Sequence, residues 1–203
     1  MTPAPAFDRA YASTKAHVLA GRWLPGQRVD LADIANELGT SLTPVRNVLY
    51  RLLGERLLTG GPNDGFIIPI RTEPDLADLF GWSASLLGIA LHASPGAHDT
   101  HEAPVDPGES LAERTRALFE AVAMRSGNGA LEIEMTSVND RLHTARLAEG
   151  AVFDDCEAEY DGLRQAIAGG VPSRIKTVLA RYHRRRIRAA GQIVRAMHRA
   201  RDL

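Results

Sequence analysis

Apolar side chains recur with helical spacing near the start of the chain, between residues 6 and 19. They return at steps of three, four and seven residues, and only Thr14 interrupts the stripe. This spacing predicts an amphipathic helix. We expect Gly21 to end it and Pro25-Gly26 to form the next turn, because glycine accepts a positive φ and proline fixes its own φ.

Two further apolar stripes follow, and each is preceded by a residue that can cap a helix. Asp30 comes before the first stripe, which ends at Gly39, and Thr43-Pro44 opens the second, which ends near Gly54. Aspartate and threonine side chains accept hydrogen bonds from the free N–H groups of a first turn, and proline is favoured as the first helical residue. Two short helices joined by a tight turn with a glycine predict a helix-turn-helix.

A pair of short apolar runs follows the third stripe. Leu57–Thr59 and Phe66–Ile70 flank the sequence Gly60-Gly61-Pro62-Asn63-Asp64-Gly65. Such runs around a Gly/Asn/Asp turn predict a β-hairpin, and a hairpin behind a helix-turn-helix is a wing. One alternative stays open at this point: three helices and a hairpin can serve only as a core, because a fold alone does not fix a function.

The remaining two-thirds of the chain has helical patterns and no clear strand pattern. Residues 93–108 are rich in proline, glycine, aspartate and histidine, which predicts a loop. The predicted fold is therefore mainly α, with a winged helix-turn-helix domain and its β-hairpin wing at 1–72 and an all-helical bundle at 73–203. Within the bundle, helices are expected over 76–91, 111–124, 130–147, 153–168 and 172–197.

Composition narrows the class of protein further. Aromatic residues make up only 5% of the chain, while alanine, leucine and arginine are abundant, which favours helices. The single cysteine, Cys156, cannot form an internal disulfide. No stretch approaches the roughly 20 apolar residues of a membrane span, and Met1–Phe7 lacks the basic and apolar regions of a secretory signal. We therefore expect a cytoplasmic protein with no membrane partner.

Charge is unevenly distributed, although the formal net charge is only −1. Lys and Arg number 8 against 6 Asp and Glu in residues 1–72, 6 against 18 in 73–170, and 10 against 1 in 171–203. The cluster Arg184-Arg185-Arg186 can attract phosphate. We favour the alternative that this basic segment pairs with acids of the middle region, across the bundle or a dimer interface. The expected acidic partners are Glu157, Glu159 and Asp161.

Several motifs follow one another through the head of the chain. They are Gly21-Arg22-Trp23-Leu24-Pro25-Gly26, Leu31-Ala32-Asp33-Ile34-Ala35, Gly39-Thr40-Ser41-Leu42-Thr43-Pro44-Val45-Arg46, Leu49-Tyr50-Arg51-Leu52 and Pro62-Asn63-Asp64-Gly65. Taken in this order, over residues 7–70, they resemble the DNA-binding domain of GntR-family transcription regulators. The resemblance implies a winged helix-turn-helix that binds double-stranded DNA.

In such a domain the N-terminal turn of the recognition helix enters the major groove. Ser41, Thr43 and Arg46 are then the expected contacts, since hydroxyl groups suit phosphate oxygens and a guanidinium reaches a phosphate or a guanine edge. In the wing, Asn63 can hydrogen-bond to the duplex, and Gly65 lets the backbone come close to it. Thr43 can equally be a helix cap and nothing more.

The head also departs from the family pattern. Family members commonly carry arginine at the position of Leu42, and often another at the position of Ala32. Loss of two cations is expected to weaken the attraction for phosphates and to flatten the salt dependence of binding, while Leu42 can contact a thymine methyl group. Lys15, Arg28 and Arg51 are the candidates for substitute charge.

The helical part is similar to the FadR-type (FCD) branch of this family, through Ser126-Gly127-Asn128 and Leu163–Gly170. Many members of that branch bind a divalent metal with an Asp and three His. The positions of these four ligands fall here on Thr115, Phe119, Tyr160 and Tyr182. Phenylalanine cannot ligate a metal, and threonine and tyrosine are poor ligands, so no metal cofactor is expected. His143 and His183 are imidazoles without a clear carboxylate partner.

The same four residues have the composition of a mainly apolar small-molecule pocket with a few hydrogen-bonding groups. That is equally the composition of a filled core. We therefore take Thr115, Phe119, Tyr160 and Tyr182 as a candidate effector pocket, with the filled core as the alternative.

These features predict a sequence-specific DNA-binding transcription regulator, a ligand-responsive repressor that acts as a homodimer through its helical domain. The alternative is a helical ligand-binding or protein-interaction module with weakened DNA binding, which Ala32 and Leu42 permit. An enzyme is not expected, because the sequence has no recognisable nucleophile–base motif, phosphate loop or metal-ligand spacing. The lone Cys156 lies among acids, which oppose thiolate formation.

Overall fold

The computed structural model describes residues 6–93 and 110–199. The chain divides into two compact units, one ending at Arg71 and the other beginning at Thr72, and each is described by itself. Nearly all of the loop predicted over 93–108 lies outside the described residues.

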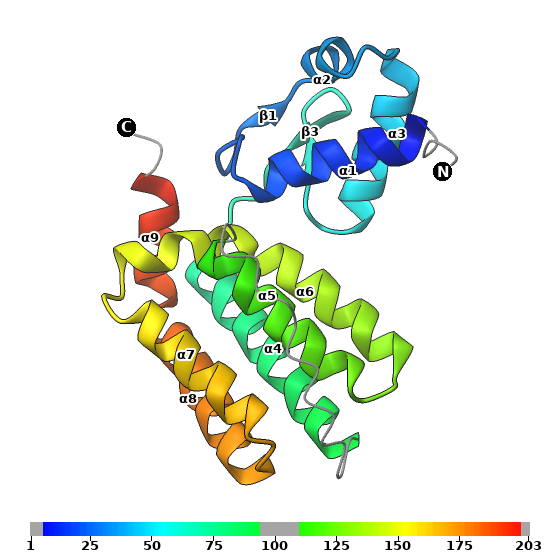
Figure 1. The fold of residues 1–203 in the computed structure, drawn as a ribbon. Coiled ribbons are helices and arrows are strands. Elements are labelled where there is room, and N and C mark those ends of the chain that lie inside the picture. Colours follow the sequence, from blue (N-terminus) through cyan, green and yellow to red (C-terminus); the bar gives the residue numbers. More distant parts are fainter. Residues whose placement is uncertain (1–5, 94–109, 200–203) are drawn as a thin grey trace. The chain divides into compact units, whose positions relative to one another are not determined.

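Three helices form the core of the first unit (Figure 1). They are α1 (Ala6–Leu19), α2 (Leu31–Glu37) and α3 (Leu42–Gly54), and they confirm the three helices predicted from the apolar stripes. α1 and α2 both pack against α3. The core that they share contains the predicted stripe residues Ile34, Ala35, Val45, Val48, Leu49 and Leu52.

The caps of α2 and α3 agree only in part with the prediction. Asp30 caps α2, because its Oδ1 accepts a hydrogen bond from the N–H of Ala32 at 2.7 Å. The N-cap of α3 is Ser41 rather than Thr43, so Pro44 is the third helical residue and not the first. Proline is tolerated there because the N–H groups of a first helical turn have no intrahelical partner.

Gly39 closes the turn between α2 and α3 with a φ of +59°. We expect Gly39→Ala to lower the free energy of unfolding by about 1 kcal/mol, because a residue with a Cβ atom is strained in the left-handed region. Gly54→Ala is the matched control, since a Cβ atom has open space at both positions but only Gly39 has a positive φ. Urea unfolding followed by circular dichroism measures both. A Gly39→Ala protein as stable as its parent would contradict the expectation.

The wing belongs to a three-stranded antiparallel sheet in the order β1-β3-β2. β2 (Thr59–Gly61) and β3 (Gly65–Ile67) form the predicted hairpin. Its turn has positive φ at Asn63 and Asp64, and the N–H of Gly65 donates to the carbonyl of Pro62 at 3.1 Å, which are the features of a type I′ turn. The third strand, β1 (Arg28–Val29), was not predicted, because two residues are too few to show a period.

The second unit is a helical bundle with α4 at its centre (Figure 1). A short 3-10 helix, η1 (Glu149–Ala151), follows α6. The helix predicted over 172–197 is wrong in one respect: the chain bends at Ala189, so two helices replace one, and Ala190 and Ile193 beyond the bend are fully buried. The helices are α4 (Glu73–Ala93), α5 (Leu111–Met124), α6 (Gly129–Ala148), α7 (Cys156–Ala168), α8 (Pro172–Arg188) and α9 (Ala190–Arg199).

α4 is the most apolar helix of this unit. By length and composition alone it is long and apolar enough to cross a membrane, which corrects the expectation that no stretch approaches that length. Leu76, Phe80 and Leu87 are nevertheless inaccessible, packed inside the bundle, while Trp82 and Ile89 are exposed. α4 contacts α5, α6, α8 and α9, as the central helix of a globular domain does.

Candidate nucleic-acid interface

The helix α3 has one buried and one exposed face. Its apolar stripe faces the core of the first unit, whereas the opposite side of the helix is open. Positions 43, 46, 47 and 50 are three and four residues apart, so they lie on one face of the helix. The exposed residues at the start of α3 and on this face are Ser41, Leu42, Thr43, Arg46, Asn47 and Tyr50.

The start of α3 offers hydrogen-bond donors to an anion. Ser41 has the extended backbone of an N-cap, but its hydroxyl makes no capping hydrogen bond. The N–H groups of the first turn, together with the exposed hydroxyl groups of Ser41 and Thr43, suit phosphate oxygens. Arg46 lies one turn further, exposed, and forms no ion pair with a described residue. The structure therefore brings Ser41, Thr43 and Arg46 together at one end of one helix.

The two wing residues of the prediction have different surroundings. Asn63 is exposed in the turn, with a φ of +55°. Gly65 is buried, and a Cβ atom there would lie 3.0 Å from the carbonyl oxygen of Pro62 and 3.4 Å from Nε of Arg28. A glycine is thus needed at position 65 because the turn closes tightly against Arg28. This differs from the predicted reason, a close approach of the backbone to DNA.

Two of the three cations considered as substitute charge are engaged within the unit. Nζ of Lys15 lies 2.9 Å from Oε2 of Glu55 and donates to the hydroxyl of Tyr11. Nε of Arg51 donates to Oε1 of Glu55 at 3.2 Å, and its guanidinium lies 3.8 Å from the ring centroid of Tyr11. Arg28, next to the wing turn, is exposed and forms no ion pair with the described residues.

Tyr50 is a further contact candidate that the sequence interpretation missed. It is 51% exposed on the same face of α3 as Thr43 and Arg46. Its ring meets that of Phe66 in β3 edge to face, with centroids 5.1 Å apart, so it links α3 to the wing. A tyrosine hydroxyl commonly contacts a DNA phosphate. The sequence could have indicated this contact, because Tyr50 follows Thr43 by seven residues, which places both side chains on one face of a helix.

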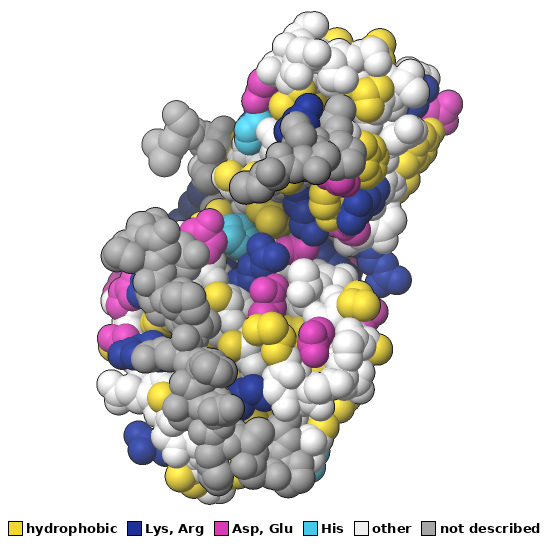
Figure 2. Space-filling view, turned by 45° about the vertical axis from the view of Figure 1, so that its right-hand side comes forward, with side chains coloured by type: hydrophobic (Ala, Val, Ile, Leu, Met, Phe, Trp, Pro, Cys, Tyr) yellow, Lys and Arg dark blue, Asp and Glu magenta, His cyan; other side chains and the backbone are white. Residues whose placement is uncertain are grey.

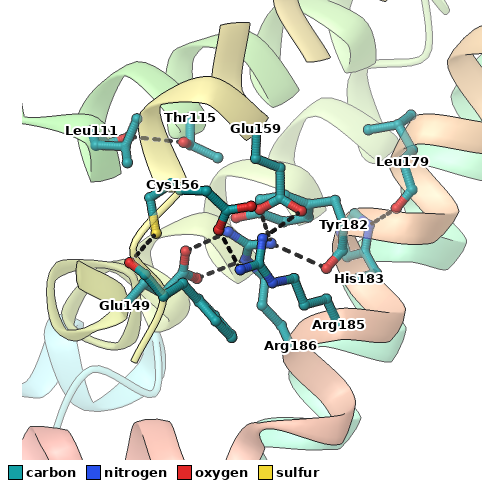
Figure 3. Close-up of polar contacts among 12 residues, drawn as sticks. Leu111, Thr115, Glu149, Cys156, Glu159, Leu179, Tyr182, His183, Arg185 and Arg186 are labelled. Carbon is teal, nitrogen blue, oxygen red and sulfur yellow. Dashed lines mark hydrogen bonds and ion pairs between the residues drawn. The ribbon is translucent and has the colours of Figure 1, made fainter. Parts of the chain in front are cut away.

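A buried charged cluster joins α8 to η1 and α7 in the second unit (Figure 3). Arg186 is 1% exposed and donates from Nε and Nη2 to the two carboxylate oxygens of Glu149, at 2.9 and 2.7 Å. Its Nη1 donates to Oε2 of Glu159 at 2.7 Å. Burial lowers the pKa of Arg186, but its neighbours Tyr182, Glu149 and Glu159 outweigh this and raise it above the usual value. The arginine therefore stays charged inside the bundle.

The predicted pairing of the basic segment 171–203 with acids of residues 73–170 is confirmed within the helical unit for two arginines. Besides Arg186, Arg185 pairs with Asp155 and with Glu159. The other expected acids have different partners: Glu157 pairs with Arg114, and Asp161 with Arg164. Figure 2 shows acidic and basic side chains interspersed on the visible surface, and not gathered into one field of a single sign.

The four residues of the candidate effector pocket are all buried. The rings of Phe119 and Tyr182 meet edge to face with centroids 5.3 Å apart. Thr115 lies one turn before Phe119 on α5, and its hydroxyl donates to the carbonyl of Leu111 at 2.7 Å. The ring of Tyr160 lies 4.9 Å from the guanidinium carbon of Arg114. The structure thus brings Phe119 and Tyr182 into contact, while Thr115 and Tyr160 have contacts of their own.

The two histidines do not form a metal site. Nδ1 of His183 donates to the carbonyl of Leu179 at 2.7 Å, so Nε2 accepts from the hydroxyl of Ser83 at 3.1 Å, and both ring nitrogens are engaged. Burial lowers the pKa of His183 to about 3 and also lowers that of His143. Among residues 6–93 and 110–199, no three His, Cys, Asp or Glu side chains lie close enough to hold a metal ion. The donor set does not fit the metal of the FCD branch.

Buried His183 makes stability depend on pH. Its pKa is about 3 in the folded protein and near 6.5 unfolded, so the unfolded chain binds the proton first as pH falls. We expect the parent to lose about 2 kcal/mol of unfolding free energy between pH 7 and pH 5 through this group. His183→Gln, compared with the parent by urea unfolding at both pH values, measures this share. Equal losses in the two proteins would rule out the assignment.

Comparison with known sequences places the head in a family. Residues 7–68 match the family model of bacterial regulatory proteins, gntR family. YdhC of Bacillus subtilis (strain 168), an uncharacterized HTH-type transcriptional regulator, is 23% identical to the chain over 141 residues, which are 70% of this chain. The chain spans 59% of the length of this curated relative.

Two solved structures share the fold of nearly the whole chain. McbR/YncC of E. coli has a TM-score of 0.68 at 19% identity, covering 93% of this chain and 98% of its own. A transcriptional regulator GntR from Rhodococcus sp. RHA1 has a TM-score of 0.68 at 18% identity, and the match covers 93% of this chain and 97% of that one. The predicted fold class, a winged helix-turn-helix followed by a helical bundle, is confirmed. Residues 7–68 form a winged helix-turn-helix domain of the GntR family of bacterial regulatory proteins.

Proposed function

We propose that the chain is a sequence-specific DNA-binding transcription regulator. The observation that carries this proposal is the exposed N-terminal end of α3 in a GntR-family domain. Uncapped N–H groups, two hydroxyl groups and the guanidinium of Arg46, which pairs with no described residue, converge there. With this end in the major groove, Ser41 and Thr43 contact phosphates and Arg46 contacts a phosphate or a guanine edge. Asn63, exposed in the wing turn, contacts the duplex from the wing.

The regulator acts in the cytoplasm as a homodimer on two half-sites related by a two-fold axis. A single recognition helix brings only a few side chains to base edges, so two copies are needed to define an operator of useful length. Closed two-fold pairs are the commonest oligomers of soluble proteins. The helical unit supplies the dimer surface.

A second function rests on the cations that this head lacks. Ala32 and Leu42 carry no charge, and Lys15 and Arg51 are bound to Glu55 instead of being open to phosphate. The second candidate is therefore a helical ligand-binding or protein-interaction module whose DNA binding is weak.

Titration of the purified protein against DNA from its own promoter region, at about 50 and 200 mM salt, separates the two functions. We expect saturable binding to one site that weakens as salt rises. Its salt dependence should be shallow, because each phosphate contact adds only about 0.9 to the logarithmic slope and few cations are open. A scrambled duplex is the control. Equal affinity for both duplexes, or no binding, would favour the second candidate.

The helical unit belongs to the FadR-type branch and responds to a small-molecule effector without a metal cofactor. The branch motif Ser126-Gly127-Asn128 makes the turn between α5 and α6, where Oδ1 of Asn128 accepts hydrogen bonds from the N–H groups of Ala130 and Leu131. The proposed effector pocket centres on Phe119 and Tyr182, whose rings are in contact, with Thr115 and Tyr160 as its other candidate residues. Metal analysis of the purified protein tests the proposal that no metal cofactor is needed, and a stoichiometric divalent ion would contradict it.

A further inference from the structure

Leu42, the first residue of α3, is an apolar side chain on an otherwise polar surface. It is 50% exposed, and its neighbours in the chain, Ser41 and Thr43, are exposed residues with hydroxyl groups. The exposed guanidinium of Arg46 follows one helical turn later. Leu42 therefore lies among the groups that the proposed function places against DNA.

Leu42 does not belong to the core of the first unit. Within residues 6–71, it is neither in the hydrophobic cluster nor among the partly buried apolar side chains packed against that cluster. Two other large apolar side chains of this unit are exposed, and each has a contact inside the unit. The ring of Tyr50 meets that of Phe66, and Ile70 covers Gly26, where an added Cβ atom would lie 3.0 Å from Cδ1 of Ile70. The stability of the fold thus does not account for a leucine at position 42.

The major groove of DNA offers one feature that a leucine side chain fits. Leucine has no hydrogen-bonding group, so it contributes to binding only by burying apolar surface. The edges of guanine, cytosine and adenine present hydrogen-bond donors and acceptors, whereas thymine also presents a methyl group at C5. A leucine placed against one of the other three bases would cover a polar group without giving it a partner, which is unfavourable. The complementary feature is therefore the thymine methyl group.

Leu42 and Arg46 are far enough apart to contact different base pairs. One helical turn rises about 5.4 Å, and successive base pairs are spaced about 3.4 Å apart. Hydroxyl contacts from Ser41 and Thr43 to phosphates fix the register of the helix on the duplex but carry no sequence information of their own. A base contact by Leu42 supplies sequence information that these polar contacts lack.

We propose that Leu42 is a specificity-determining residue that buries the C5-methyl group of one thymine in each half-site. The inference rests on the DNA-binding function proposed above and names one base that the operator contains. In a two-fold dimer the thymine recurs at the symmetry-related position of the second half-site.

Replacement of thymine by deoxyuridine tests this contact, because uracil lacks only the methyl group and still pairs with adenine. The promoter site is synthesised with thymine or with deoxyuridine throughout, and fluorescence anisotropy measures the affinity for each duplex. Synthetic DNA carries no methylated cytosine, so thymine is the only source of a C5-methyl group. Deoxyuridine should weaken binding about fourfold for each buried methyl group, and hence about 15-fold for a dimer. Single replacements should trace the loss to one thymine in each half-site.

Leu42→Asn and Leu42→Met separate the methyl contact from an effect of uracil on the DNA itself. Asparagine is close to leucine in size but lacks its apolar surface, so Leu42→Asn should bind the two duplexes equally well. Methionine is apolar and of similar volume, so Leu42→Met should still prefer thymine. Leu147→Asn is the matched control, at a 45% exposed leucine of α6 in the other unit, and should prefer thymine as the parent does. Circular dichroism checks that each variant is folded.

An equal loss on deoxyuridine DNA in the parent and in Leu42→Asn would overturn the inference, because the loss would then come from the DNA alone. A parent that binds both promoter duplexes equally well, but not scrambled DNA, would overturn it as well and would leave the regulator proposal intact. Failure of the regulator proposal looks different: the parent then shows no preference for the promoter duplex over scrambled DNA, and both proposals are overturned together.

Discussion

Arg46→Ala is expected to abolish site-specific DNA binding and to leave the protein folded. Arg46 is exposed on α3 and contacts no described acid, so its removal disturbs no packing, and alanine is the best helix former. A guanidinium on a base edge contributes about 1–3 kcal/mol of discrimination. A dimer loses two such contacts at once, in a head that already lacks cations at Ala32 and Leu42. The affinity for the operator should therefore fall at least ~100-fold.

Fluorescence anisotropy with a labelled promoter fragment measures this loss, and circular dichroism with thermal unfolding checks the fold. Arg184→Ala is the matched control, because Arg184 is an exposed helical arginine of the other unit and forms no ion pair with a described residue. The salt slope separates two roles of Arg46: loss of a phosphate contact reduces the slope, whereas loss of a base contact mainly reduces the preference over scrambled DNA. Unchanged affinity would show that α3 is not the recognition helix.

The helices of the head follow from its apolar stripes, but the details at their ends do not. The stripes of α2 and α3 are explicit in the sequence, and so is the cap at Asp30. Ser41 and Thr43 are both good N-cap residues two positions apart, and only the backbone decides which has the extended conformation. β1 carries no periodicity in its two residues, and its pairing with β3 depends on the rest of the fold.

In the helical unit, buried charged residues lie at positions that the hydrophobic pattern assigns to the surface. A stripe of apolar residues predicts which face is buried, yet Arg186 and Arg146 lie inside the bundle. Of four neighbouring arginines in α8, Arg184 and Arg188 are exposed while Arg186 is buried, and the sequence alone does not show which acids lie opposite. The exposed face of α3 was easier to predict, because a family motif fixed its register.

Arg186→Met should be the most destabilising single change in the helical unit. It leaves Glu149, 3% exposed, without its bidentate partner and removes one partner of Glu159. Breaking a buried ion pair by removing one partner typically costs about 3–5 kcal/mol, because the remaining charge stays buried. Urea unfolding followed by circular dichroism measures the loss. Arg188→Met, at an exposed arginine of the same helix, is the control and should stay within about 0.5 kcal/mol of the parent.

The double variant Arg186→Met/Glu149→Gln tests whether an unpaired charge is the cause. The neutral glutamine side chain removes the buried negative charge, and Glu159 keeps its contact with Arg185, so the double variant should be more stable than Arg186→Met alone. Burial already raises the pKa of Glu149 in the parent, where Arg186 opposes this rise. Loss of Arg186 should raise that pKa further, so the folded state of Arg186→Met binds a proton more readily than the folded parent does. Its stability relative to the parent should therefore recover as pH falls from 8 to 5. The contrary result would be that the two substitutions are strictly additive and that the stability difference between Arg186→Met and the parent does not change with pH. The lost stability would then come from lost packing against Tyr182.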